Sequence, residues 1–379
     1  MITWRSGTVV SLAEAWSGAV ELDVATDGGE PMRALAYPAL VGEPAVGDRV
    51  LLNVSAQARG LGTGGYALVV ARPDALPADP EPGPGHLVKA RYTPLQAMVL
   101  GVDEQESPHH GLLRDADDLA GMPVVVADLH SALPAVVAGA RHAATIAGRR
   151  PPRVVYVMTD GGALPAWFSR TASGLREAGW LDACVTVGQA FGGDLEAVTV
   201  HTGLLAARLV CDAELVVVAQ GPGNLGTGTR WGFSGVAAGE AVNAVATLGG
   251  QSVASLRVSG ADPRERHRGI SHHSLTAYGR VALAAADVVV PVADPADADA
   301  PWRDAARAAL LARVREQAGE LCAAHGGHRL VEVAAGADLL AALGTSPVRL
   351  TTMGRGLDAD PEAFLAAAVA GVHAVSIAP

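Results

Sequence analysis

Hydrophobic and polar positions follow two different patterns along the chain. Five short apolar stretches alternate with turn residues such as Gly-Gly and Gly-Asp up to residue 73. Strand-sized stretches at intervals of about 10–15 residues are typical of a small antiparallel barrel. We therefore predict an all-β barrel domain over residues 1–75.

A proline-rich stretch separates this region from the rest of the chain. Residues 76–85 hold prolines at positions 77, 80, 82 and 84. Such a segment is extended and stiff. We predict that it links two domains.

From residue 86 onward, continuous apolar runs alternate with helical patterns. Runs such as residues 123–127 and 215–219 contain no polar position, which is typical of strands buried on both faces. Helical patterns between such runs predict a mostly parallel, doubly wound (Rossmann-like) α/β sheet over residues 86–379. Residues 346–354 form a further candidate strand.

The predicted topology places the polar loops of this domain at one edge of the sheet. In a parallel sheet, the loops that follow the strands emerge at the carboxyl ends of those strands. Small, acidic and imidazole side chains follow successive apolar runs, at residues 128–131, 159–162, 192–196 and 221–224. The sequence therefore predicts a site at this edge of the sheet.

A glycine-rich stretch at residues 221–235 follows one of the buried runs. Residues 221–226 match the GxGxxG pattern of dinucleotide-binding loops. That interpretation requires a helix that begins inside the motif and an acid after the next strand, and neither is clear. We favour a cradle for a phosphate or carboxylate, because hydroxyls, backbone N–H groups and a guanidinium suit oxyanions. The ligand-binding residues of this hypothesis are Gly161, Gly162, Gly193, Gly221, Gly223, Asn224, Thr227, Thr229, Arg230 and Arg264.

Two carboxylates follow neighbouring predicted strands beside Gly-Gly pairs. Asp160 and Asp194 are suited to bind a divalent cation or to act together in general acid–base catalysis. The alternative is that each caps the helix that it precedes.

Several histidines occur in the same set of loops. His267, His272 and His273 lack the i, i+4 spacing of a helical zinc motif. With His130 they are candidates for a metal site built in three dimensions, or for a general acid and base. The alternative is that they are surface histidines beside a helix N-cap at Ser271 or Ser274. Our catalytic candidates are Asp160, Asp194, His130, His267 and His272, and the candidates for a divalent metal ion are Asp160, Asp194, His272 and His273.

Charge and composition narrow the class of partner. A net charge of −11 argues against general nucleic-acid binding, which requires Lys and Arg to displace counterions. Cysteines at positions 184, 211 and 322 form no CxxC pair, as expected for reduced thiols in a cytoplasmic protein. No signal peptide or membrane-length apolar run is visible. The oligomeric state stays open, with a homo-oligomer as one alternative.

Several phrases of the sequence together resemble an uncharacterised bacterial family, domain-of-unknown-function family 3866. They include GMPVVVADLHSALPAV, VVYVMTDGGALP, GPGNLGTGTRWGFSG and RERHRGISHHSLTAYGRVAL. The resemblance covers nearly the whole chain and implies the same two-part organisation. It implies no activity, so no catalytic residue is carried over from it.

These observations favour an enzyme, a hydrolase or transferase, that acts on a small anionic or phosphorylated metabolite. A divalent metal ion is its candidate cofactor. One alternative is a non-catalytic small-molecule-binding or regulatory protein, and a second is a nucleotide-binding Rossmann-type protein. The sequence leaves open whether the chain is an enzyme.

Overall fold

The computed structural model describes residues 2–62, 64–293 and 304–378. The chain divides into two compact units. One comprises Met1–Leu100 with Trp167–Ser173, and the other comprises Gly101–Ala166 with Gly174–Pro379.

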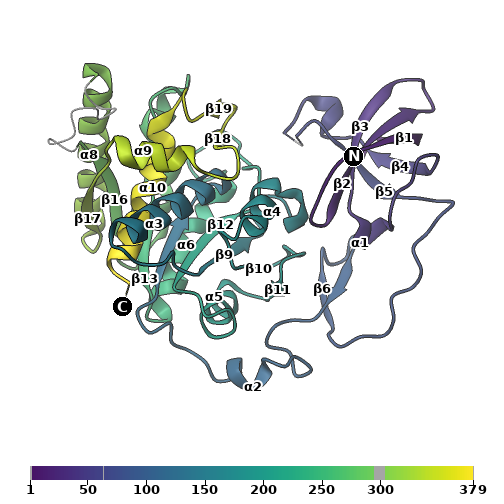
Figure 1. Cartoon of the computed structure of the whole chain (residues 1–379), viewed down its shortest axis with the longest axis horizontal. Helices are drawn as coiled ribbons and strands as arrows, with labels where there is room; N and C mark the ends of the chain where they lie inside the picture. Colours follow the sequence, from purple (N-terminus) through teal and green to yellow (C-terminus); the bar gives the residue numbers. More distant parts are fainter. Residues whose placement is uncertain (1, 63, 294–303, 379) are drawn as a thin grey trace. The chain divides into compact units, whose positions relative to one another are not determined.

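The first unit contains a closed barrel with the strand order β1-β2-β3-β5-β4 (Figure 1). β1 pairs antiparallel with β2 on one side and with β4 on the other. Val9, Leu22 and Leu52 fill the interior and are almost fully buried, because alternate side chains of each strand point inward. The predicted all-β barrel is therefore confirmed. The elements of this part of the chain are β1 (Trp4–Trp16), β2 (Ala19–Thr26), β3 (Pro31–Ala36), α1 (Pro38–Val41), β4 (Arg49–Asn53), η1 (Gln57–Arg59), β5 (Ala67–Ala71), β6 (Leu87–Lys89) and β7 (Ala97–Val99).

The second unit is built on an all-parallel sheet with the strand order β11-β10-β9-β12-β8-β13-β16-β17 across the described residues. Every residue of β8 and β12 is buried, as their uninterrupted apolar runs predict. The predicted parallel α/β sheet is therefore confirmed. Its strands are β8 (Pro123–Ala127), β9 (Val154–Thr159), β10 (Ala183–Thr186), β11 (Leu195–Glu196), β12 (Leu215–Gln220), β13 (Gln251–Ser255), β16 (Asp287–Val292) and β17 (Arg329–Ala334).

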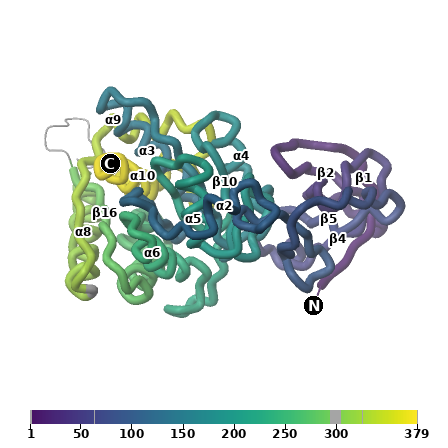
Figure 2. Tube along the Cα trace, turned by 90° about the horizontal axis from the view of Figure 1, so that it is seen from below, coloured from purple at the N-terminus to yellow at the C-terminus, as the bar shows by residue number. Residues whose placement is uncertain are grey.

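Helices cover both faces of this sheet (Figures 1 and 2). α3 packs against α9 and α10, whereas α6 packs against α5 and η6, and η6 in turn contacts α8. Across the described residues, every helix is too short or too polar to span a lipid bilayer. The helices are α2 (His110–Leu113), η2 (His130–Ala132), α3 (Leu133–Ile146), η3 (Ala166–Phe168), α4 (Arg170–Glu177), α5 (Val200–Leu209), η4 (Ser234–Val236), α6 (Ala237–Thr247), η5 (Glu265–His267), α7 (His272–Thr276), η6 (Ala277–Val281), α8 (Ala305–His325), α9 (Ala337–Gly344) and α10 (Pro361–Ser376).

The chain leaves neighbouring strands toward opposite faces. β8 and β12 are hydrogen-bonded neighbours, yet β8 continues into α3 and β12 continues into α6. Figure 2 shows α3 and α6 on opposite sides of the sheet. Such a switch point opens a crevice at the carboxyl ends of the strands, where parallel α/β sheets bind ligands.

The candidate strand at residues 346–354 is wrong in its extent. Only Thr351–Thr352 forms a strand, β18, and it pairs with β19 (Arg355–Gly356) outside the main sheet. Met353 and Gly354 between them both have positive φ, 49° and 78°. This turn folds the chain back on itself before a longer strand can form. A second small pair, β14 (Val258–Ser259) and β15 (Gly269–Ile270), brackets the loop that carries His267.

Candidate functional site

A hydrogen-bond network joins the ends of the central strands. Gln220 ends β12, and its Nε2 donates to the backbone oxygen of Asp128, directly after β8, at 2.8 Å. Tyr156 of β9 donates its hydroxyl to the backbone oxygen of Gln220 at 2.9 Å. Because the hydroxyl proton of Tyr156 is used in this bond, His130 Nδ1 is the donor in its own hydrogen bond to the Tyr156 oxygen at 3.1 Å. Burial lowers the pKa of His130 to about 4, which keeps this ring neutral at neutral pH.

Close packing of loops explains the predicted glycines. A Cβ at Gly162 would lie 2.3 Å from the oxygen of Gly221, and a Cβ at Gly221 would lie 2.6 Å from the oxygen of Ala163. At Gly161 it would lie 2.9 Å from Gln220 Oε1, and at Gly193 it would lie 2.7 Å from the oxygen of Cys184. These positions exclude a side chain because neighbouring backbone or side-chain atoms occupy its space.

The glycine-rich stretch folds back on itself. A β-bridge pairs Gly226 with Phe233, and Thr227 donates its N–H to the oxygen of Gly232 at 2.7 Å. The hydroxyls of Thr227 and Thr229 bond to each other and to the backbone of Gly232. We call residues 226–233 the glycine hairpin. The Thr227 and Thr229 hydroxyls, which we predicted to bind an anion, therefore form hydrogen bonds within the glycine hairpin.

The base of the glycine hairpin is closed by Asn224. Asn224 Oδ1 accepts hydrogen bonds from Gln220 Nε2, Ser234 Oγ and the N–H of Gly235 at 3.0–3.3 Å. Gly223 supplies a positive φ of 88° at the turn before it. Helix α6 begins at Ala237, well after residues 221–226, so no helix starts inside the GxGxxG motif.

The two predicted catalytic carboxylates are exposed and accept hydrogen bonds from backbone N–H groups of other segments. Asp160 Oδ2 accepts from the N–H of Gln189 at 3.0 Å. Asp194 accepts from the N–H of Cys184 at 2.7 Å and from Arg176 at 3.0 Å. Each carboxylate thus joins two segments of chain, and the donors are not the first N–H groups of a following helix.

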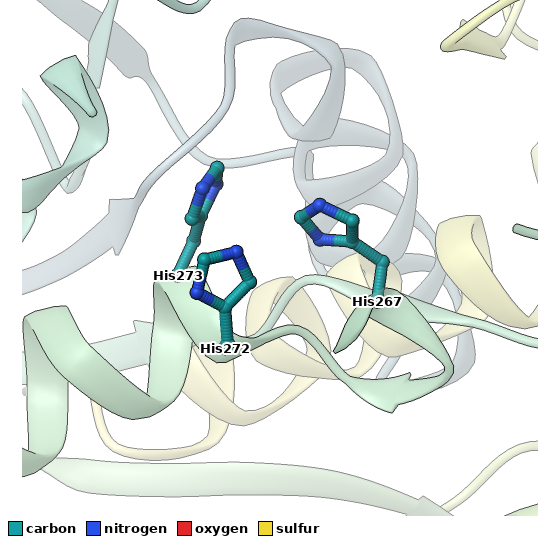
Figure 3. Close-up of side chains that lie close together, drawn as sticks. All are labelled: His267, His272 and His273. Carbon is teal, nitrogen blue, oxygen red and sulfur yellow. The ribbon is translucent and has the colours of Figure 1, made fainter. Parts of the chain in front are cut away.

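The structure brings three of the predicted histidines together. Among the described residues, His267, His272 and His273 are the only group of three or more His, Cys, Asp or Glu side chains placed to share a metal ion. One nitrogen of each ring lies within 4.8 Å of the others. Figure 3 shows His267 facing His272 and His273 across a common space. His130, Asp160 and Asp194 lie outside this group, which we call the histidine cluster.

Local structure around Ser271 holds the histidine cluster in place. Ser271 is the N-cap of α7, and its Oγ accepts from the N–H of His273 at 3.2 Å. The same oxygen bonds His267 Nδ1 at 2.7 Å. The predicted cap at Ser271 is confirmed, and it joins the ring of His267 to the backbone of His273.

Burial keeps the cluster uncharged. Burial, together with the charges of Arg257 and other nearby groups, lowers the pKa of His267 and that of His273 to about 3 each. Burial and the charge of Arg266 lower the pKa of His272 as well. Neutral imidazoles carry a lone pair that can bind a metal ion. His272 Nε2 is buried and has no hydrogen-bond partner among the described atoms, an arrangement that costs about 1–3 kcal/mol.

Arg257 connects the histidine cluster to buried carboxylates. Its Nη1 donates to His273 Nδ1 at 3.3 Å, and its Nη2 lies 3.9 Å from Asp262 Oδ2. Asp262 is fully buried and binds Arg264 through both of its oxygens at 2.9 Å. The predicted anion ligand Arg264 therefore forms an ion pair within the protein.

Asp128 lies in one of the predicted site loops, but no role was assigned to it from the sequence. Asp128 is buried, and burial raises its pKa to about 6 although the charge of Arg257 acts in the opposite direction. The signal was present, since Asp128 is the first polar residue after a wholly apolar strand. Arg257 has a similar signal, as a lone cation just after β13.

An open pocket of about 490 Å³ lies beside the histidine cluster. His272 lines it, and so does Arg230 from the tip of the glycine hairpin. Arg280 of η6 and Gln317 and Glu320 of α8 also line it. The pocket thus combines a neutral imidazole with two arginines and one carboxylate, that of Glu320.

No curated protein matches the chain. Residues 33–371 match a family described as protein of unknown function (DUF3866). This match covers the later part of the barrel and the whole parallel sheet, and on this basis the chain belongs to the DUF3866 family.

Proposed function

We propose that the protein is a hydrolase that binds a divalent metal ion at the histidine cluster and acts on a small phosphorylated or carboxylated metabolite. The observation that carries the proposal is the buried, unpaired Nε2 of His272 within a group of three neutral imidazoles. A buried polar atom without a partner is rare in proteins, and such atoms often belong to sites that bind an ion or another ligand.

The imidazole nitrogens of the cluster indicate which class of metal ion would bind. Imidazole nitrogen suits Zn²⁺ and other late divalent transition metals, whereas Mg²⁺ and Ca²⁺ prefer oxygen. Three histidines with a fourth position open to water are typical of catalytic zinc, which lowers the pKa of bound water to about 7. Nitrogen ligands of tetrahedral zinc lie about 3.4 Å apart. The 4.8 Å limit of the cluster therefore calls for a modest closure around the ion.

The arginines around the cluster favour an anionic substrate. Arg230 and Arg280 line the pocket beside His272, and a guanidinium can bind phosphate or carboxylate with two parallel hydrogen bonds. Their charges disfavour a bare cation. A metal ion accompanied by an anion meets no such penalty, so both ligands are expected to bind together.

His273 adds a second reason for this coupling. A neutral imidazole offers one lone pair, and in His273 the bond from Arg257 engages Nδ1 and leaves the proton on Nε2. An anion that draws Arg257 away frees this ring to change its tautomer and to bind the metal ion through Nε2. Anion binding thus promotes metal binding in this proposal.

Calorimetric titration with Zn²⁺ tests the metal site, with and without inorganic phosphate. We expect binding that tightens at least about tenfold with phosphate, and at least a tenfold loss in His272→Ala. His201→Ala is the matched control, because His201 is exposed on α5 and remote in sequence from the cluster. Equal Zn²⁺ affinity in wild type and His272→Ala would refute the site.

Turnover is tested separately with a panel of phosphate and carboxylate esters on the zinc-loaded protein. Hydrolysis that His272→Ala abolishes and His201→Ala retains supports the enzyme. Zinc and phosphate binding without turnover on the panel would contradict the hydrolase and favour the regulatory alternative.

A further inference from the structure

A basic groove lies at the amino ends of the central strands, the edge of the sheet opposite to the histidine cluster. It has a volume of about 590 Å³, within the range of small-molecule sites. It is lined by the segments that lead into β8, β9 and β12 and by the ends of α5 and α10. Arg149, Arg150, Arg153 and Arg208 are among its described lining residues.

Three of these arginines donate hydrogen bonds to acceptors within the protein. Arg150 binds both carboxylate oxygens of Glu214 at 2.7 Å. Arg153 Nε donates to the oxygen of Asp212 at 2.7 Å, and Arg149 Nη2 donates to the oxygen of Val375 at 3.2 Å. These bonds fix three guanidinium groups around the groove while leaving donor groups available on each.

Arg208 differs from the other three arginines. It lies in the last turn of α5, and its Nε is buried without a hydrogen-bond partner among the described atoms. A buried donor on a charged group is costly to leave unpaired. The unpaired Nε therefore indicates an acceptor that comes from outside the chain.

The charge balance of the groove indicates the class of this acceptor. The described lining residues include four arginines but only Asp212 and Glu214 as acids, in a chain whose net charge is −11. Concentrated positive charge is thus a local property of the groove. A rigid fork of arginine donors matches the geometry of phosphate oxygens.

We infer that the basic groove is a second ligand site, which binds a small molecule carrying a phosphate or pyrophosphate group. The five residues of β8 place it roughly 15 Å or more from the loops at the other edge. The two sites therefore share no residues, and the inference does not depend on the proposed hydrolase.

Calorimetric titration with inorganic pyrophosphate at constant ionic strength tests the inference, with EDTA present to keep the histidine cluster free of metal. Wild type is expected to bind, and Arg208→Gln is expected to bind at least about tenfold more weakly. Arg315→Gln is the matched control, because Arg315 forms an exposed ion pair with Glu332 and does not line the groove. When the same three pyrophosphate titrations are repeated with His272→Ala added to each protein, the relative affinities are expected to stay the same.

Thermal melting without ligand separates binding from folding. Arg208→Gln is expected to melt at or above the wild-type temperature, because it removes an unpaired buried donor. Equal pyrophosphate affinity in wild type and Arg208→Gln would overturn the inference. An equal response to pyrophosphate and to matched sodium chloride would also overturn it, since it would indicate only general screening of charge.

Discussion

Asp128 Oδ2 accepts a hydrogen bond from Ser274 Oγ at 3.2 Å, although 146 residues separate them in the sequence. The bond ties the end of β8 to the first turn of α7, one residue after His273. Ser274 Oγ also accepts from the N–H of Arg257 at 2.9 Å. The most buried part of the sheet thus positions the histidine cluster.

Removing the Ser274 hydroxyl should loosen the cluster without deleting a metal ligand. Ser274→Ala removes one hydrogen bond to the buried Asp128 and the acceptor of the Arg257 N–H, so we expect a loss of about 1–3 kcal/mol in the free energy of unfolding. We also expect Zn²⁺ affinity to fall about tenfold or more, as for other residues that orient metal ligands. Urea denaturation and zinc titration measure the two effects. Ser376→Ala, at an exposed residue whose hydroxyl bonds only to His373 of the same helix among the described residues, is the control, and unchanged zinc affinity in Ser274→Ala would contradict the positioning role.

Asp128 should make stability depend on pH in an unusual direction. Burial raises its pKa from 3.8 to about 6, so the folded protein holds a proton that the unfolded chain has lost. This contribution to stability is complete below about pH 4 and is lost as pH rises through 6. Relative to Asp128→Asn, wild type should lose roughly 3 kcal/mol between pH 4 and pH 7. Denaturation curves across this range provide the measurement, and parallel curves for the two proteins would argue against the raised pKa.

The loop contact at Gly162 should tolerate no side chain. In Gly162→Ala the new Cβ would meet the Gly221 oxygen at 2.3 Å, so we expect a loss of about 2 kcal/mol or more. Gly111→Ala is the matched control, since no heavy atom lies within 4 Å of a Cβ at that position. Thermal denaturation should show a lower melting temperature for Gly162→Ala alone. A neutral result would mean that the two loops separate easily.

Replacing Asp262 should lower the free energy of unfolding more than replacing an exposed carboxylate. It is fully buried between Arg264 and Arg355, and Asp262→Asn leaves the Arg264 guanidinium without its charged partner, whereas Arg355 keeps Asp360 at 2.9 Å. We expect a loss of about 3 kcal/mol in the free energy of unfolding. Asp27→Asn, which breaks an exposed ion pair with Arg49, should change stability little. Similar losses from both variants in urea would contradict this difference.

The sequence predicted the barrel, the parallel sheet and the edge at which the histidines gather, because these follow from local patterns of apolar residues. It did not predict which loop residues meet. The glycines at 162 and 221 were interpreted as ligand contacts, whereas each makes room for the other loop. Thr227 and Thr229 bond their own hairpin, which no spacing rule reveals. Asp128 and Arg257 follow buried strands, which the sequence shows, but no role was assigned to them because their roles depend on contacts between distant segments.

Burial of β8 and β12 on both faces has a consequence for amide hydrogen exchange. Backbone amides of these strands open only with the whole sheet and should exchange slowest, while amides of the exposed glycine hairpin should exchange fast. Arg230 at its tip reaches the same pocket as His272. A ligand in that pocket should therefore slow exchange in residues 226–233 and leave the strands unchanged, so the hairpin amides would report occupancy directly.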